Sequence, residues 1–169
     1  MVDESIYERS ELVTRDRFPA ARQNKEVCHL DGWVHTLCMA KIFLIVLIVF
    51  LVFDAIWLLG ISRELYQRAI GFLMPEKVNL FAAMGAYILL AVGLTVFVIA
   101  PGIRAGLSVG HIALFGALFG FVAYGIYDFT NLATIKGWPL WISLVDMGWG
   151  TLVSGLSTAV TVYLLRFFS

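Results

Sequence analysis

Four long apolar stretches constrain the fold of this chain more than any other feature. A transmembrane helix needs about 20 consecutive, mostly apolar residues. The first stretch contains a run from Ile42 to Phe53 that lacks the alternation expected of a lipid-exposed barrel strand. The sequence therefore predicts an all-α, polytopic membrane protein that folds as an antiparallel four-helix transmembrane bundle. The predicted spans are residues 42–61, 80–100, 112–134 and 140–165.

The distribution of charge supports this assignment. Hydrophobic residues make up 60% of the chain and charged residues only 14%, which is unusual for a soluble domain. Half of the charged residues lie in residues 1–40, so the rest of the chain is too apolar to face water. No cluster of Lys and Arg follows Lys41, which argues against nucleic acid as a partner. The expected partner is the lipid bilayer.

The chain divides into two parts. Residues 1–38 are polar, contain Pro19 and show no sustained periodicity, which predicts disorder. They also lack the short basic start and apolar core of a signal peptide. Met39 comes shortly before the first span and resembles a natural start, so this segment is interpreted as a disordered or non-native extension. Residues 39–169 form the transmembrane domain.

The sequence predicts neither a metal centre nor a cofactor. Both cysteines, Cys28 and Cys38, lie in the polar N-terminal segment, and the three histidines are scattered along the chain. This arrangement offers no thiolate or imidazole site within the apolar part. The sequence also has no phosphate loop, zinc motif or dinucleotide fingerprint.

Three aspartates lie inside the predicted spans: Asp54, Asp128 and Asp146. Each is six or seven residues from one end of its span, or about 9–11 Å at 1.5 Å per residue. The first and third spans run in the same direction and the fourth runs in the opposite one. The three span ends therefore lie at one membrane surface, and the three carboxyl groups should share a common depth.

Polar and small residues accompany these aspartates at helical spacing. Tyr124, Asp128 and Asn131 should share one face of the third span, while Gly116 and Gly120 form a packing motif. The fourth span carries a seam of small and polar residues, and an indole follows two of the acids by one turn. The seam is Ser143, Asp146, Gly150, Ser154, Ser157 and Thr161, and the indoles are Trp57 and Trp149.

An aspartate in the middle of a span costs about 2.5–3.5 kcal/mol on insertion scales, which favours a functional role for three of them. The spans contain no Lys or Arg to neutralise these acids, so at least one should remain protonated. The leading hypothesis is a pocket that binds or moves a proton, a cation or a small polar solute. Its predicted residues are Asp54, Asp128, Asp146, Asn131, Tyr124, Tyr127, Trp57, Trp149 and Ser143.

Two alternatives remain open at the level of sequence. The first is a membrane-embedded enzyme that acts on lipid with an aspartate as general acid and base, although the spans offer no evident nucleophile. The second is a structural or accessory subunit, in which the acids only join helices through hydrogen bonds worth about 1 kcal/mol or less.

Four short motifs resemble a bacterial family of small four-helix integral membrane proteins classed as a domain of unknown function. The resemblance covers about Ala40 to Arg166, and the first 38 residues depart from it. It implies an inner-membrane protein and assigns no activity. The motifs are Asp54-x-x-Trp57, Tyr127-Asp128-x-Thr130-Asn131-Leu132-Ala133, Gly137-Trp138-Pro139 and Val145-Asp146-x-x-Trp149-Gly150.

Four spans place both termini on the same side of the membrane. Lys41, Arg104, Arg166 and the five bases of residues 1–38 put eight bases on that side, against four on the other. The positive-inside rule then favours cytoplasmic termini. Without residues 1–38 the tally is three to four, so the orientation depends on the N-terminal segment.

Overall fold

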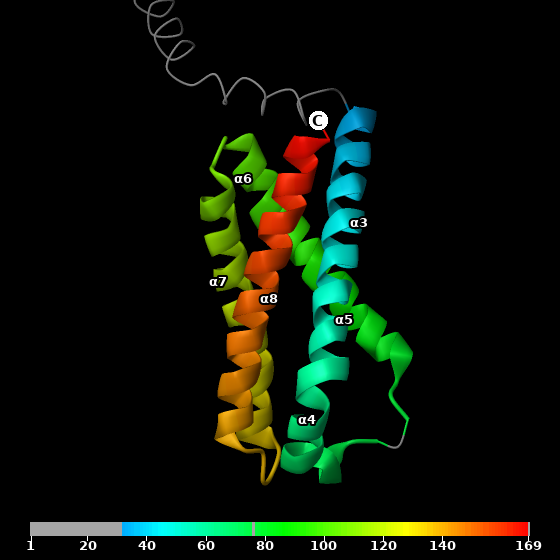
Figure 1. Cartoon of the computed structure of the whole chain (residues 1–169), viewed down its shortest axis with the longest axis vertical. Coiled ribbons are helices and arrows are strands. Elements are labelled where there is room, and N and C mark those ends of the chain that lie inside the picture. Colours follow the sequence, from blue (N-terminus) through cyan, green and yellow to red (C-terminus); the bar gives the residue numbers. More distant parts are fainter. Residues whose placement is uncertain (1–31, 76, 169) are drawn as a thin grey trace, which may run out of the picture.

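The computed structural model describes residues 32–75 and 77–168, and within these ranges the chain forms helices and no strand. Figure 1 shows the main helices in chain order. The elements are α3 (Gly32–Ile56), the π-helical turn η1 (Trp57–Ser62), α4 (Arg63–Ile70), the 3-10 turn η2 (Gly71–Leu73), α5 (Leu80–Gly93), the π-helical turn η3 (Leu94–Ile99), α6 (Ala100–Arg104), α7 (Val109–Thr134) and α8 (Leu140–Phe167).

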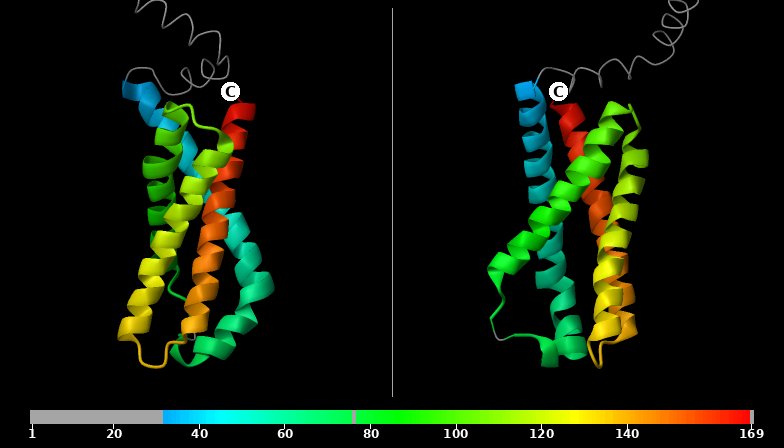
Figure 2. Two further views of the ribbon diagram at one scale, coloured as in Figure 1. Left: turned by 90° about the vertical axis from the view of Figure 1, so that its left-hand side faces the viewer. Right: turned by 180° about the vertical axis from the view of Figure 1, so that it is seen from behind.

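Four helical segments are long and apolar enough to cross a membrane, which confirms the predicted all-α bundle. They are Thr36–Gly60, Leu80–Arg104, Val109–Thr134 and Leu140–Phe167. The beginning of α3 and the end of α8 lie at one end of the bundle, here called the terminal end (Figures 1 and 2). The opposite end carries α4 and is called the α4 end.

The first span begins earlier than the sequence predicted. Helix α3 starts at Gly32, so residues 32–38 are helical rather than part of a disordered extension. Once an apolar helix has formed, each added residue gains a hydrogen bond without a new nucleation cost, and the helix extends into the polar segment. Residues 1–31, for which the sequence predicts disorder, lie outside the described residues.

Helices α7 and α8 form a closely packed antiparallel hairpin. The turn between them contains Gly137 at φ 83°, a conformation that glycine adopts without steric cost. A Cβ atom at Gly116 would overlap Thr158, and one at Gly120 would overlap Ser154. The predicted packing motif and the small residues of α8 therefore bring the two backbones together.

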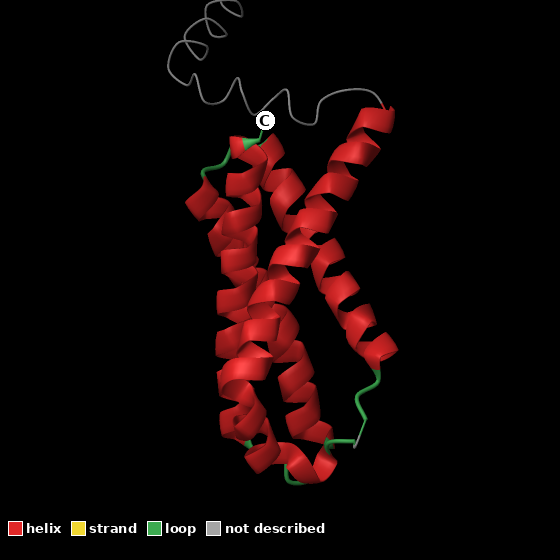
Figure 3. Ribbon diagram, turned by 45° about the vertical axis from the view of Figure 1, so that its right-hand side comes forward, coloured by secondary structure: helices red, strands yellow, loops and turns green. Residues whose placement is uncertain are grey.

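The two ends of the bundle differ in composition. Near the terminal end, the spans share a fully buried apolar core that includes Val46, Leu94, Ile112 and Val162. Toward the α4 end, α5 diverges from the other helices (Figures 2 and 3), and Phe81 near its start is 89% exposed. The buried carboxyl groups lie in the half of the bundle that contains α4.

Candidate functional site

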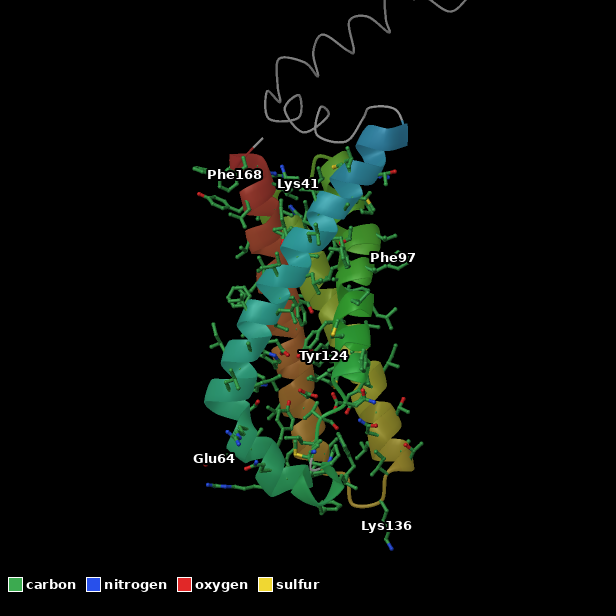
Figure 4. The ribbon with its side chains drawn as sticks, turned by 90° about the vertical axis from the view of Figure 1, so that its right-hand side faces the viewer. Lys41, Glu64, Phe97, Tyr124, Lys136 and Phe168 are labelled. Atoms are coloured by element: carbon green, nitrogen blue, oxygen red, sulfur yellow. The ribbon has the colours of Figure 1, made fainter. Side chains whose placement is uncertain are left out.

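The structure brings together the three aspartates that the sequence singled out. Asp54 of α3 is buried, Asp128 of α7 is completely buried, and Asp146 of α8 is partly buried. The charge of Asp146 acts on Asp128, and the charge of Asp54 acts on Asp146. All three interact electrostatically with Tyr124, which lies inside the bundle in Figure 4. These four residues are called the acidic cluster.

Asp54 has a hydrogen-bond donor for each carboxylate oxygen. The indole Nε1 of Trp149 donates to Oδ1 at 2.9 Å, and the hydroxyl of Tyr87 donates to Oδ2 at 2.5 Å. The donors come from α8 and α5, so one side chain of α3 joins three spans. Hydrogen bonds of this kind between helices stabilise membrane bundles.

Asp146 is bound by a residue from outside the spans. The hydroxyl of Tyr66, on α4, donates a hydrogen bond to Oδ1 of Asp146. Burial raises the pKa of Tyr66 above its ordinary value of 10.0, and the charge of Asp146 raises it further. The Tyr66 hydroxyl therefore keeps its proton and remains a donor at physiological pH.

Asp128 differs from the other two acids. Both of its carboxyl oxygens are buried, and neither meets hydrogen-bond geometry with a described residue. Ser143 is close enough to interact with it, and the Ser143 hydroxyl accepts a hydrogen bond from Trp138 Nε1 at 2.9 Å. A buried carboxylate without donors is costly, so this group needs a proton or another positive charge.

Two indole side chains stack on each other beside the acidic cluster. Trp57 stacks on Trp149, with ring centroids 4.5 Å apart and ring planes inclined by 7°. The Nε1 atom of Trp57 is buried, and the Tyr66 hydroxyl is close enough to interact with this indole. Both indoles were predicted to lie near a carboxyl group, and the structure places Trp149 in contact with Asp54.

Two predicted site residues lie apart from the carboxyl groups. Tyr127 is 56% exposed, and its ring makes an edge contact with Trp138. It follows Tyr124 by three residues but is exposed, and its role in the pocket stays a prediction. Asn131 is partly buried one turn beyond Asp128, and its Nδ2 atom has no hydrogen-bond partner among the described residues.

Three further residues of this region were not predicted: Tyr66, Tyr87 and Trp138. Tyr87 had a usable signal, because it lies seven residues inside its span, at the depth that the acids share. Tyr66 and Trp138 lie between spans, and the sequence does not show that these connections fold back onto the bundle.

The carboxyl groups do not converge on one point. Across residues 32–75 and 77–168 there is no group of three or more His, Cys, Asp or Glu side chains that could hold a metal ion. Tyrosine hydroxyls lie near the acids instead: Tyr66 binds Asp146, Tyr87 binds Asp54, and Tyr124 interacts with all three aspartates. Hydroxyl and carboxyl groups in this arrangement can both accept and donate protons.

Comparison with known proteins gives a single match. The family model described as "Predicted membrane protein (DUF2177)" matches residues 39–163, which is well over half of the chain. No curated protein and no solved structure matched. The match confirms the resemblance seen in the sequence motifs. The chain therefore belongs to the DUF2177 family of predicted membrane proteins.

Proposed function

We propose that this integral membrane protein binds a proton in the acidic cluster and transfers it among the carboxyl and hydroxyl groups there. The observation that carries this proposal is the environment of Asp128, whose two oxygens are buried without a donor. The predicted spans contain no Lys or Arg that could neutralise this group. A proton on Asp128 removes the charge and gives the carboxyl group a hydrogen to donate.

A proton suits this geometry better than a cation. A small metal cation is usually held by several oxygen ligands at once. The aspartates interact pairwise instead: Asp128 interacts with Asp146, and Asp146 interacts with Asp54. A small polar solute would have to supply donors to the two oxygens of Asp128, which are both buried.

A lipid-modifying enzyme is a weaker reading of the same residues. A general acid must come within hydrogen-bonding distance of the bond it protonates. Asp128 is completely buried, so a lipid in the surrounding bilayer does not reach it. A purely structural subunit is the remaining alternative, and in that case none of the acids would need to titrate.

We further propose a bacterial inner-membrane location with cytoplasmic termini. The support is the number of Lys and Arg residues on each side of the membrane. When residues 1–38 are counted, eight lie on the side of the termini and four on the other side. With this orientation the acidic cluster lies toward the opposite, outer surface of that membrane.

Infrared titration of the protein in lipid nanodiscs tests proton binding. The carbonyl band of a protonated carboxyl group should change with pH, and Asp128→Asn should remove one component of that change. Asn preserves the shape of the side chain and abolishes its titration. Glu64→Gln is the matched control, since Glu64 is exposed on α4 and should affect only the signal of a solvated carboxyl group. A titration that Asp128→Asn leaves unchanged would exclude Asp128 as the proton-binding group and favour the structural alternative.

A further inference from the structure

Helix α4 follows the first span at one end of the bundle (Figure 1), in the half that contains the acidic cluster. Arg63, Glu64, Gln67 and Arg68 are exposed, with an ion pair of 3.0 Å between Arg68 and Glu64. The other face is partly buried and consists of Leu65, Tyr66, Ala69 and Ile70. A short helix with one polar and one apolar face is typical of a segment that lies in the membrane interface.

Tyr66 connects this interfacial helix to the acidic cluster. Its ring is partly buried on the inner face of α4, and its hydroxyl donates to Asp146. The same hydroxyl interacts electrostatically with Tyr124 and with the indole of Trp57. A proton that moves between the α4 surface and the cluster therefore meets Tyr66 on its way.

The junction between α3 and α4 is a π-helical turn, Trp57–Ser62. Such turns are rare and often occur at functional sites, where they alter the course of a helix. Trp57 opens this turn and stacks on Trp149 of α8, so the inner end of the junction is held against the bundle. A Cβ atom added at Gly60, within the turn, would have nothing within 4 Å, so this part of the junction borders open space.

The terminal half of the bundle offers no comparable route. Its centre is filled by apolar side chains that are fully buried, among them Val46, Leu94 and Val162. The buried side chains of Ser154 and Thr158 on α8 lie directly against Gly120 and Gly116 of α7. At Gly116 even a Cβ atom would overlap Thr158, so this interface is too tight for a file of water molecules.

From this difference between the two halves of the bundle we infer that the acidic cluster exchanges protons with one membrane surface only, the surface at α4. We also infer that Tyr66 gates this exchange. The inference rests on the proposed function, since it assigns a direction and a gating residue to the same proton-binding site. Tyr66 is a positioning residue for the transfer: its hydroxyl accepts a proton from the α4 side while donating its own to Asp146, and the reverse step restores it.

Sealed vesicles of known orientation test the direction. A protease-cleavable tag on the C-terminus distinguishes vesicles with the terminal end outside from those with the α4 end outside. An external pH jump is followed by rapid-exchange infrared spectroscopy of the carboxyl band that Asp128→Asn removes. We expect a prompt response only when the α4 end faces outward. A prompt response in both orientations would overturn one-sided access while leaving proton binding intact.

Two substitutions at Tyr66 test the gate. Tyr66→Phe keeps the ring but removes the transfer hydroxyl, and we expect proton exchange to become slower by about 10²-fold, the lower end of the effect of a positioned proton donor. Tyr66→Ala removes the ring as well and should make exchange faster than in wild type. The equilibrium amplitude of the carboxyl band should persist in both variants, which separates a kinetic role from a loss of the site.

Tyr163→Phe is the matched control, because it removes an exposed tyrosine hydroxyl of α8 that lies outside the acidic cluster. It should leave the exchange rate at its wild-type value. Unchanged exchange rates in both Tyr66 variants would overturn the gating role. A protein in which no carboxyl band responds to pH in any orientation would refute the proposed function, and this inference with it.

Discussion

The three intramembrane carboxyl groups have the same chemistry but different neighbours. Asp54 accepts from a tyrosine and an indole, Asp146 accepts from Tyr66, and Asp128 accepts from no described residue. A carboxylate with two donors can remain ionised in a low-dielectric environment far more easily than one with none. The three acids thus differ in the hydrogen-bond donors that reach them.

A common depth of the acids is a prediction at this scale, because it follows from residue spacing and helix rise. The hydrogen-bond partners were not predictable, since the contacts of Tyr66 with Asp146 and of Tyr87 with Asp54 join residues 80 and 33 positions apart. Tyr127 is exposed, whereas Asp128 is completely buried. It lies next to Asp128 in the sequence, but adjacent helix residues point about 100° apart.

Tyr87→Phe should destabilise the protein by about 1 kcal/mol, because it removes one donor to Asp54 and keeps the ring. Reversible unfolding in mixed micelles measures the change in the free energy of unfolding. Tyr163→Phe, at an exposed tyrosine of α8, should have no measurable effect. Equal stability of the two variants would show that the Tyr87 hydroxyl contributes nothing.

Tyr66 makes stability depend on pH in the alkaline range. Its pKa is raised in the folded protein, so ionisation favours the unfolded state. The stability contributed by this hydroxyl is complete below its ordinary pKa of 10.0 and is lost as pH rises above that value. The free energy of unfolding should therefore fall above about pH 10 less steeply in Tyr66→Phe than in wild type. Parallel curves for the two proteins would contradict this linkage.

Among the elements, the α7–α8 hairpin is the most closely packed part of the molecule. Gly116 and Gly120 of α7 lie directly against the seam of α8, and the seam residues Ser143, Ser154, Ser157 and Thr161 are completely buried. The sequence predicted this contact because small residues recur at helical spacing. It did not predict the π-helical turns or the divergence of α5, since these depend on how whole helices pack.

Gly120→Ala should destabilise the protein by about 1–3 kcal/mol, because the new methyl group would overlap the backbone of Gly150 and the side chain of Ser154. Gly148→Ala is the matched control on α8, where no atom lies within 4 Å of the added group. It should be neutral or stabilising, by up to about 1 kcal/mol, since alanine favours the helix. A comparison of unfolding midpoints checks both changes, and equal effects would contradict the packing argument.

At the scale of the whole molecule, polarity is divided between the two ends of the bundle. The terminal end holds the apolar core, and the half that contains α4 holds the carboxyl groups and their hydroxyl partners. Four helices and their alternating direction followed from the lengths of the apolar stretches. The close packing at the terminal end and the divergence of α5 at the α4 end did not follow from the sequence, because they depend on packing between spans that are distant in the chain.

The hydrogen bond between Asp54 and Trp149 has a consequence for biosynthesis. The two residues are 95 positions apart, so the first span enters the membrane long before its indole donor has been translated. Until then the nascent helix carries a carboxyl group without that partner, at an insertion cost of about 3 kcal/mol. The first span is also the most apolar of the four, and its many Leu, Ile and Val side chains offset that cost during insertion. The last span is the least apolar, and it arrives when a partly built bundle is already present to receive its polar seam.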